Sequence, residues 1–135
     1  MDDRELIGIA LAAREKTYSV YSGVAVGCAL LTKSGKVYIG ANVENASYGA
    51  TVCAERVAFC SAVIEGERDF SKIAIAGGLW GKRPTEPFYP CGICRQFMSE
   101  FCDKNFEIII SNGTGYEKYT LGELLPHDFG GDKLK

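Results

Sequence analysis

Long apolar stretches and clusters of basic residues are both missing from this sequence. No segment approaches the roughly 18 apolar residues needed to span a bilayer, so we expect no transmembrane helix. No run of four or more basic residues occurs, and the formal net charge is −2, from 15 basic and 17 acidic side chains. Because nucleic-acid binding usually needs clustered Lys and Arg, the composition argues against a nucleic-acid partner.

Histidine and an export signal are missing or scarce as well. His127 is the single histidine and stands beside Pro126, where a surface position is expected. The acidic start, Met1–Glu5, leads into an amphipathic segment, so we expect no signal peptide and a cytoplasmic protein. In that setting the 6 cysteines are expected to be thiols or metal ligands instead of disulfides.

What the chain does have is the composition of a globular protein. Its 135 residues, 47% hydrophobic and 24% charged, are close to the averages for globular domains. A chain of this size buries about two-thirds of its unfolded surface, which is enough for one core. With no repeat and no linker-like stretch, we predict a single domain over residues 1–135.

Apolar spacing and breaker residues predict the elements. Helices are expected at 3–17, Cys53–Glu65 and Cys91–Asp103, with one helical turn at Leu121–Leu125. Strands are expected at Val26–Thr32, Lys36–Ala41, Lys72–Ala76, Glu107–Ser111 and Tyr116–Thr120. Asn42–Val52 and the Pro- and Gly-rich Gly77–Pro90 are expected to be loops. This order predicts an α/β fold, a mixed sheet of about five strands sandwiched by helices.

Three cysteines stand where predicted loops run into predicted helices. Cys53 begins the segment C-A-E-R, and Cys91 and Cys94 belong to P-C-G-I-C-R-Q. Unsatisfied backbone N–H groups and the positive dipole end at a helix start stabilise thiolates. The residue types and their placement therefore predict a zinc site with three thiolate ligands.

Two plainer interpretations remain open at this point. Structural zinc normally has four protein ligands, but Cys28 lies mid-strand in an apolar run, and Cys60 and Cys102 fall inside helices. A thioredoxin-like redox pair would need C-x-x-C just after a strand, whereas a long loop precedes Cys91. Both interpretations are less favourable than an open catalytic site. Glu55, two residues after Cys53, could otherwise be only a solvated charge in a first helical turn.

At these motifs the sequence resembles the small zinc-dependent cytidine deaminases, from about Leu6 to Phe129. The resemblance implies hydrolytic deamination of cytidine and 2′-deoxycytidine to uridine and 2′-deoxyuridine by a zinc-activated water. One Zn²⁺ per chain is implied on Cys53, Cys91 and Cys94, and Glu55 is implied to move protons between water, ring N3 and the leaving amine. As a hypothesis, the Arg56 guanidinium draws charge from the sulfurs as an outer-shell group.

The resemblance also implies substrate contacts, with two departures. Asn42 and Glu44 are implied to hydrogen-bond the ribose 3′-hydroxyl, although Asn is also common in ordinary turns. Where the family usually places an aromatic ring on the pyrimidine, this chain has Val24, so we expect a pocket that tolerates a bulkier base. Val20 replaces the usual Pro before Tyr21.

Assembly and competing functions complete the expectations. Relatives of this type are homotetramers, which implies that Tyr48 and Phe129 approach a neighbouring subunit's substrate. A deaminase of a cytosine-containing antibiotic of the blasticidin type is the nearest alternative, but those typically lack Arg56 and the Asn42–Glu44 pair. A polynucleotide editor and a non-enzymatic zinc module are less favoured. No residue can be assigned to the 2′ position, so cytidine and deoxycytidine are not ranked.

Overall fold

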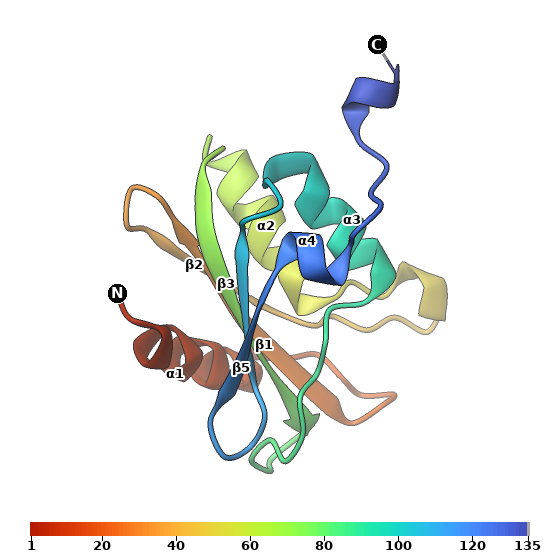
Figure 1. Ribbon diagram of the computed structural model, residues 1–135. Helices are drawn as coiled ribbons and strands as arrows, with labels where there is room; N and C mark the ends of the chain where they lie inside the picture. Colours follow the sequence, from red (N-terminus) through yellow and green to blue (C-terminus); the bar gives the residue numbers. More distant parts are fainter. Residues whose placement is uncertain (135) are drawn as a thin grey trace.

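The computed structural model describes residues 1–134 and has a five-stranded sheet at its centre. Its order is β2-β1-β3-β4-β5 (Figure 1). β3 and β4 run parallel, and every other neighbouring pair is antiparallel. The bounds are β1 Val24–Thr32, β2 Val37–Ala41, β3 Phe70–Leu79, β4 Glu107–Ser111 and β5 Tyr116–Thr120. The predicted α/β fold with a mixed sheet is confirmed.

Four α-helices follow the predicted order, with slightly different ends. They are α1 Asp3–Ala13, α2 Ala54–Ile64, α3 Gly92–Phe101 and α4 Leu121–Leu124, and short 3-10 turns occur at Arg14–Lys16, Tyr48–Ala50 and Gly131–Leu134. The first helix is shorter than the predicted 3–17 because its final residues tighten into a 3-10 turn, a common helix ending. No helix within residues 1–134 has the length and apolar character that crossing a membrane requires.

Both faces of the sheet are covered. Alternate residues of β1 face opposite sides, so Cys28 and Leu30 join a cluster with α2 and α3, while Ala29 and Leu31 join a second cluster with α1. Figure 1 shows α1 apart from α2 and α3. Since apolar residues of the central strands are buried on both sides, their near-continuous hydrophobic sequence is explained.

Strands β1 and β3 both begin two residues earlier than predicted, at Val24 and Phe70, and the largest difference is at the end of β3. Gly77–Leu79 was expected to begin a loop, but β3 continues through these residues. The reason is tertiary pairing. β1 begins at Val24, which pairs with Leu79 of β3, and the register continues unbroken to the pair formed by Leu31 and Lys72. Pairing with the long strand β1 overrides the weak strand preference of Gly77 and Gly78.

The start of α2 is brought against the sheet by a glycine. A Cβ atom on Gly40 of β2 would collide with the backbone of Ala54 and Ala58. The missing side chain lets the helix backbone lie directly on the strand. Because Ala54 follows Cys53 at once, this contact fixes the height of the first predicted metal ligand above the sheet.

Candidate metal centre and substrate pocket

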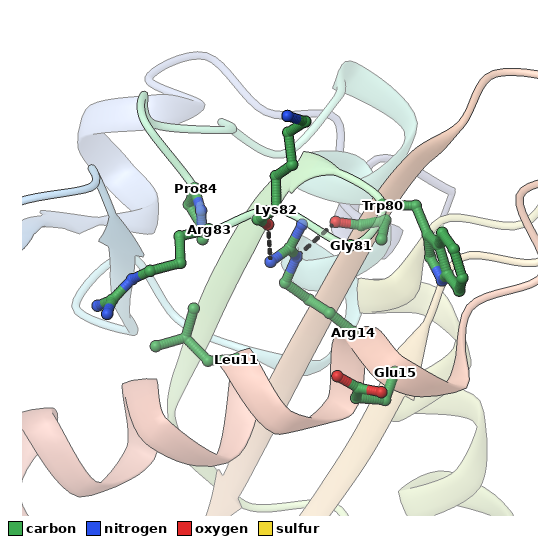
Figure 2. A pocket seen from close by; sticks show the side chains of 9 residues that line it. Leu11, Arg14, Glu15, Trp80, Gly81, Lys82, Arg83 and Pro84 are labelled. Carbon is green, nitrogen blue, oxygen red and sulfur yellow. Dashed lines mark hydrogen bonds between the residues drawn. The ribbon is translucent and has the colours of Figure 1, made fainter.

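Two of the hollows in the structure differ in the chemistry that they offer. The larger has a volume of about 490 Å³ and lies between α1 and the segment after β3, with Leu11, Trp80 and Arg83 among its lining (Figure 2). Glu15 is the only side chain of metal-ligand type among its lining residues. Size alone therefore does not identify the site, and the thiol cluster lies at the smaller hollow.

Arg14 is engaged in holding the segment that follows β3. Its guanidinium donates to the carbonyl oxygens of Ala25, Lys82 and Leu79, each at 2.9 Å. Figure 2 shows the side chain reaching from the 3-10 turn that follows α1 toward Lys82. With three donors committed to backbone oxygens, this guanidinium ties the end of β3 to the 3-10 turn that follows α1.

Three thiols meet where α2 and α3 begin. The sulfur atoms of Cys53, Cys91 and Cys94 all lie within 4.8 Å of one another, and those of Cys53 and Cys91 are 3.7 Å apart. All 6 cysteines are free thiols. Three sulfur donors at this separation fit a tetrahedral zinc ion that keeps its fourth position open, as catalytic zinc sites do.

The helix starts determine this meeting. Cys53 is the N-cap of α2 and Cys91 is the N-cap of α3, both with extended backbone, and Cys94 lies in the first turn of α3. Neither cap makes a side-chain hydrogen bond to its own helix, so both sulfurs are available to a metal. The helix-start placement predicted from the sequence is confirmed.

Neighbouring donors favour a thiolate at Cys53. A hydrogen bond from Cys94, assisted by Arg56, lowers the pKa of Cys53 to about 5. The hydrogen bond that Cys94 donates to Cys53, together with burial, raises the pKa of Cys94. Metal ligation requires all three cysteines to lose their protons, and zinc uptake at this cluster releases them.

Arg56 lies beside the thiols, as the outer-shell hypothesis requires. One of its terminal nitrogens donates to Cys53 Sγ at 3.7 Å and to the Thr51 carbonyl oxygen at 3.4 Å. Its Nε is buried and has no hydrogen-bond partner among the described residues. A guanidinium with a spare buried donor next to sulfur suits a negatively charged cluster.

Glu55 is a carboxyl group withdrawn from water. It is 4% exposed, in the first turn of α2, and it lines the smaller hollow together with Cys53 and Cys91. Burial, with the nearby Cys53 charge as a smaller cause, raises the pKa of Glu55 to about 7. A buried charge of this kind is costly unless a ligand or metal accompanies it, so a solvated surface role does not describe Glu55.

The smaller hollow has a volume of about 260 Å³ and brings together most of the predicted site residues. Val24, Asn42 and Glu44 line it with Glu55 and two of the three clustered thiols. The full lining is Ser22, Val24, Val26, Asn42, Glu44, Thr51, Cys53, Ala54, Glu55, Ile75, Phe88, Tyr89 and Cys91.

Asn42 and Glu44, the predicted sugar-binding pair at this hollow, already make hydrogen bonds within the chain. The Oδ1 atom of Asn42 accepts from Thr17 Oγ1 at 2.5 Å and from Val26 N at 3.0 Å, and its Nδ2 donates to Val24 O at 2.8 Å. The side chain of Asn42 therefore has one N–H left for a ligand.

The carboxylate of Glu44 holds the backbone turn at Tyr21 and Ser22. Its Oε1 accepts from the backbone N–H groups of Tyr21 and Ser22 at 2.9 and 3.0 Å, and its Oε2 accepts from Ser22 Oγ. The hydrogen bond from the Ser22 hydroxyl, with those from the two backbone groups, lowers the pKa of Glu44. Glu44 is thus a carboxylate that holds the Tyr21–Ser22 turn at the rim of the hollow.

Tyr48 and Phe129 do not line the hollow of their own chain. Tyr48 is 75% exposed and packs edge-on against Tyr21, with 6.1 Å between ring centroids. Phe129 is 57% exposed, and its carbonyl oxygen accepts from Gln96 Nε2 at 2.7 Å. Their predicted role at a neighbouring subunit's site stays a prediction.

Two aromatic residues of the hollow were not predicted as site residues. Phe88 and Tyr89 lie just before Pro90 in the segment expected to be a loop, and both line the hollow. The signal in the sequence was their position directly before the P-C-G-I-C motif, because residues next to a metal ligand must approach the metal.

Comparison with known proteins identifies the family. Residues 1–110 match the family described as the cytidine and deoxycytidylate deaminase zinc-binding region. The chain is 47% identical to a cytidine deaminase of Halalkalibacterium halodurans, over 96% of this chain and 95% of that protein. The chain belongs to the zinc-binding deaminase family. It is an enzyme of the zinc-dependent deaminase type.

Solved structures and a more distant relative agree with this family. The fold matches the crystal structure of a cytidine deaminase from Burkholderia pseudomallei with a TM-score of 0.88, at 44% identity, covering 96% of this chain and 100% of that one. A blasticidin-S deaminase of Bacillus cereus is 33% identical over 92% of this chain and 89% of its own length. The zinc cofactor of the deaminase family fits the three-thiol cluster.

Proposed function

We propose that this enzyme deaminates cytidine and 2′-deoxycytidine hydrolytically, consuming one water and releasing uridine or 2′-deoxyuridine and ammonia. One observation carries the proposal: a single hollow is lined by two cysteines of the three-thiol cluster, by the buried Glu55, and by Asn42 and Glu44. A metal, a proton carrier and sugar-directed polar groups are thus within reach of one small ligand.

In this proposal Glu55 performs every proton transfer. A zinc ion held by Cys53, Cys91 and Cys94 supplies Lewis-acid activation of the attacking water. Glu55 takes a proton from that water and gives it to ring N3, which makes C4 electrophilic. The water oxygen adds to C4. Glu55 then takes the second proton from this oxygen and passes it to the amino group, so the C4–N bond breaks, ammonia leaves and the C4 carbonyl forms. A carboxyl that is buried at the hollow but outside the thiol ligand set suits both steps.

The remaining polar residues position the nucleoside. Asn42 offers its free N–H to the ribose 3′-hydroxyl, and Glu44 accepts from the same hydroxyl or holds the turn that borders it. Arg56 donates to the sulfur of Cys53 and reduces the charge that three thiolates place on the metal.

A second candidate is deamination of a cytosine-containing antibiotic. The likeness to a blasticidin-S deaminase, at 33% identity, favours keeping it in the test. The Asn42–Glu44 pair at the hollow suits a ribose instead, because an amide donor and a carboxylate acceptor match a sugar hydroxyl.

A substrate screen decides between the two. Purified zinc-loaded protein is given cytidine, 2′-deoxycytidine, cytidine 5′-monophosphate or blasticidin S, and loss of the exocyclic amine is followed by absorbance. We expect turnover of the two nucleosides, at least about a hundredfold faster than of the antibiotic. Turnover of blasticidin S alone would overturn the proposal in favour of the second candidate.

We also propose that the enzyme works as a homotetramer in the cytoplasm, in pyrimidine salvage. Free thiols at all six cysteines suit a reducing compartment. The exposed aromatic rings of Tyr48 and Phe129 support burial against a second copy of the chain.

A further inference from the structure

The sheet face that lines the smaller hollow has one position with no side chain, at Gly77. Val24 and Val26 of β1 share one face of the sheet, and Ile75 and Gly77 of β3 share the same face. Val26 is paired directly with Gly77. The apolar side chains of Val24, Val26 and Ile75 therefore border a space at position 77, where no side chain is present. Val24, Val26 and Ile75 all line the hollow.

The ring of Phe88 occupies this gap. A Cβ atom built on Gly77 would lie 2.5 Å from Phe88 Cγ and 2.6 Å from Cδ2, far inside van der Waals contact. The ring therefore rests directly on the Gly77 backbone, and any side chain at position 77 would displace it. Phe88 is half-buried and lines the hollow that also contains Glu55.

Contacts on both sides hold Phe88 in place. The Tyr89 hydroxyl donates to Glu117 Oε1 at 2.8 Å, and Arg95 Nε donates to the Pro90 carbonyl oxygen at 2.8 Å. At the other end of the segment, Arg14 donates to the carbonyl oxygens of Leu79 and Lys82. The contact with Lys82 is drawn in Figure 2. The ring is thus presented to the hollow by a segment fastened at its two ends.

We propose that Phe88 is a specificity-determining residue that forms the aromatic wall for the pyrimidine ring. The proposal rests on cytidine deamination as the reaction. A planar base gains from face or edge contact with an aromatic ring beyond what an aliphatic side chain of similar size provides. Val24, at the same hollow, is too small to make such a contact, whereas Phe88 reaches the hollow from a different element.

A substitution at Phe88 can distinguish the effect of the aromatic ring from the effect of the volume that it fills. Phe88→Leu keeps most of the volume over Gly77 but removes the aromatic face. We expect KM for cytidine to rise about fivefold to tenfold with kcat changed less than twofold, because the base contact is made in the ground state and the transition state alike. Affinity for uridine, measured by calorimetry, should fall by the same factor. Gly77→Ala should act in the same direction, because it pushes the intact ring away.

A second substitution tests whether the lost function is the ring itself. In Val24→Phe/Phe88→Leu a ring returns from β1, and KM should recover to within about twofold of the original value. Trp80→Ala is the matched control, since Trp80 is 65% exposed, follows β3 directly and does not line the catalytic hollow. It should leave KM unchanged. Zinc content and the thermal midpoint, measured for every variant, report on folding.

The outcomes distinguish this proposal from the reaction on which it rests. Wild-type protein that does not turn over cytidine contradicts the proposed function. If the wild type is active and Phe88→Leu keeps KM within twofold, the aromatic-wall role alone is overturned. A raised KM that Val24→Phe does not restore also overturns it, because Phe88 would then act through the packing over Gly77.

Discussion

Cys91 gives the clearest residue-scale test of the metal centre. It is the N-cap of α3, its sulfur lies 3.7 Å from that of Cys53, and no other cysteine belongs to the cluster besides Cys94 among residues 1–134. Removing one of three protein ligands leaves a site that cannot complete a zinc coordination sphere. We therefore expect Cys91→Ala to lose most of its zinc and at least about a hundredfold in activity.

Metal analysis of the purified variant measures the loss. Cys60→Ala is the matched control, because Cys60 is an exposed thiol on α2 outside the cluster. It should keep one zinc per chain and full activity. Full zinc retention by Cys91→Ala would remove Cys91 from the ligand set.

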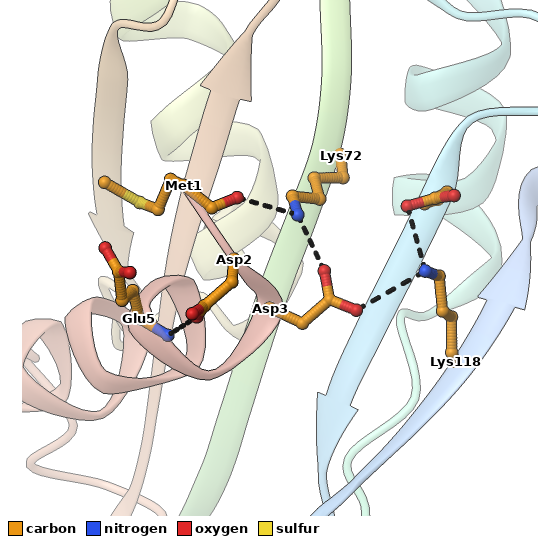
Figure 3. Close-up of polar contacts among 7 residues, drawn as sticks. Met1, Asp2, Asp3, Glu5, Lys72 and Lys118 are labelled. Carbon is orange, nitrogen blue, oxygen red and sulfur yellow. Dashed lines mark hydrogen bonds and ion pairs between the residues drawn. The ribbon is translucent and has the colours of Figure 1, made fainter.

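At the scale of elements, an ion pair fastens α1 to the sheet. Lys72 Nζ on β3 lies 2.6 Å from Asp3 Oδ1 at the start of α1, and the two side chains are only 12% and 14% exposed (Figure 3). Lys118 on β5 adds a contact of 3.4 Å to the other carboxylate oxygen. Asp3 also carries negative charge in the first turn of the helix, where the dipole favours it.

The pH dependence follows from the direction of the pKa shift. The hydrogen bond from Lys72 lowers the pKa of Asp3 below its ordinary value. The ionised form is thus favoured by folding, so its contribution is full above the unfolded pKa, about 4, and is lost as the pH falls through the lower folded pKa. We expect Asp3→Asn to reduce the free energy of unfolding by about 1–3 kcal/mol at pH 7 and by much less near pH 3.

Urea unfolding of both proteins at each pH measures the difference. The comparison is made between proteins at the same pH, because acid releases zinc from both. Asp132→Asn is the control, since the Asp132–Lys133 pair is 3.9 Å apart with side chains 77% and 62% exposed. It should change the free energy of unfolding by less than about 0.5 kcal/mol. An Asp3→Asn effect that does not shrink on acidification would contradict the role of the ion pair.

The elements also show what the sequence allowed to be predicted. The three thiols, Glu55 and the helix starts followed from local spacing, because caps and ligands lie within a few residues of one another. The order of strands and helices followed from apolar periodicity. The extension of β3 through Gly77 did not, because glycine has little strand preference and only pairing with β1 requires it.

Tertiary contacts explain the remaining differences in the site. Phe88 reaches the hollow only because Gly77 leaves room on a strand that is adjacent in space. Most of the hydrogen-bonding capacity of Asn42 is used by Thr17, Val24 and Val26, which no local pattern could indicate. Asn42 is therefore a brace between β1 and its neighbours as well as a proposed substrate contact.

At the scale of the whole molecule, the proposed tetramer would place Phe129 at the site of a neighbouring subunit. This ring is 57% exposed and lies outside the hollow of its own chain. If it completes the site of a neighbour, Phe129→Ala should lower kcat/KM for cytidine about tenfold while one zinc per chain is retained. Light scattering on the intact protein should give about four times the chain mass of 14.7 kDa. Leu134→Ala, in the same tail and also exposed, is the control.

Mixed assemblies test whether the site is shared. Chains carrying Phe129→Ala keep Glu55, and chains carrying Glu55→Gln keep Phe129. Co-expressed, the two should form assemblies in which some sites regain both groups, so activity should exceed that of either variant alone. A monomeric protein with full activity, or no gain on mixing, would contradict a neighbour's role for Phe129.

In the proposed reaction, the buried Glu55 carries protons beside a zinc ion held by three cysteines. Kinetics of cytidine deamination by zinc-loaded Glu55→Gln, with metal content measured on the same sample, test it most directly. We expect one zinc per chain, an unchanged fold and a fall in kcat of at least about a hundredfold, because the amide cannot exchange a proton. Near-normal turnover in a fully zinc-loaded Glu55→Gln protein would show that Glu55 is not the proton carrier.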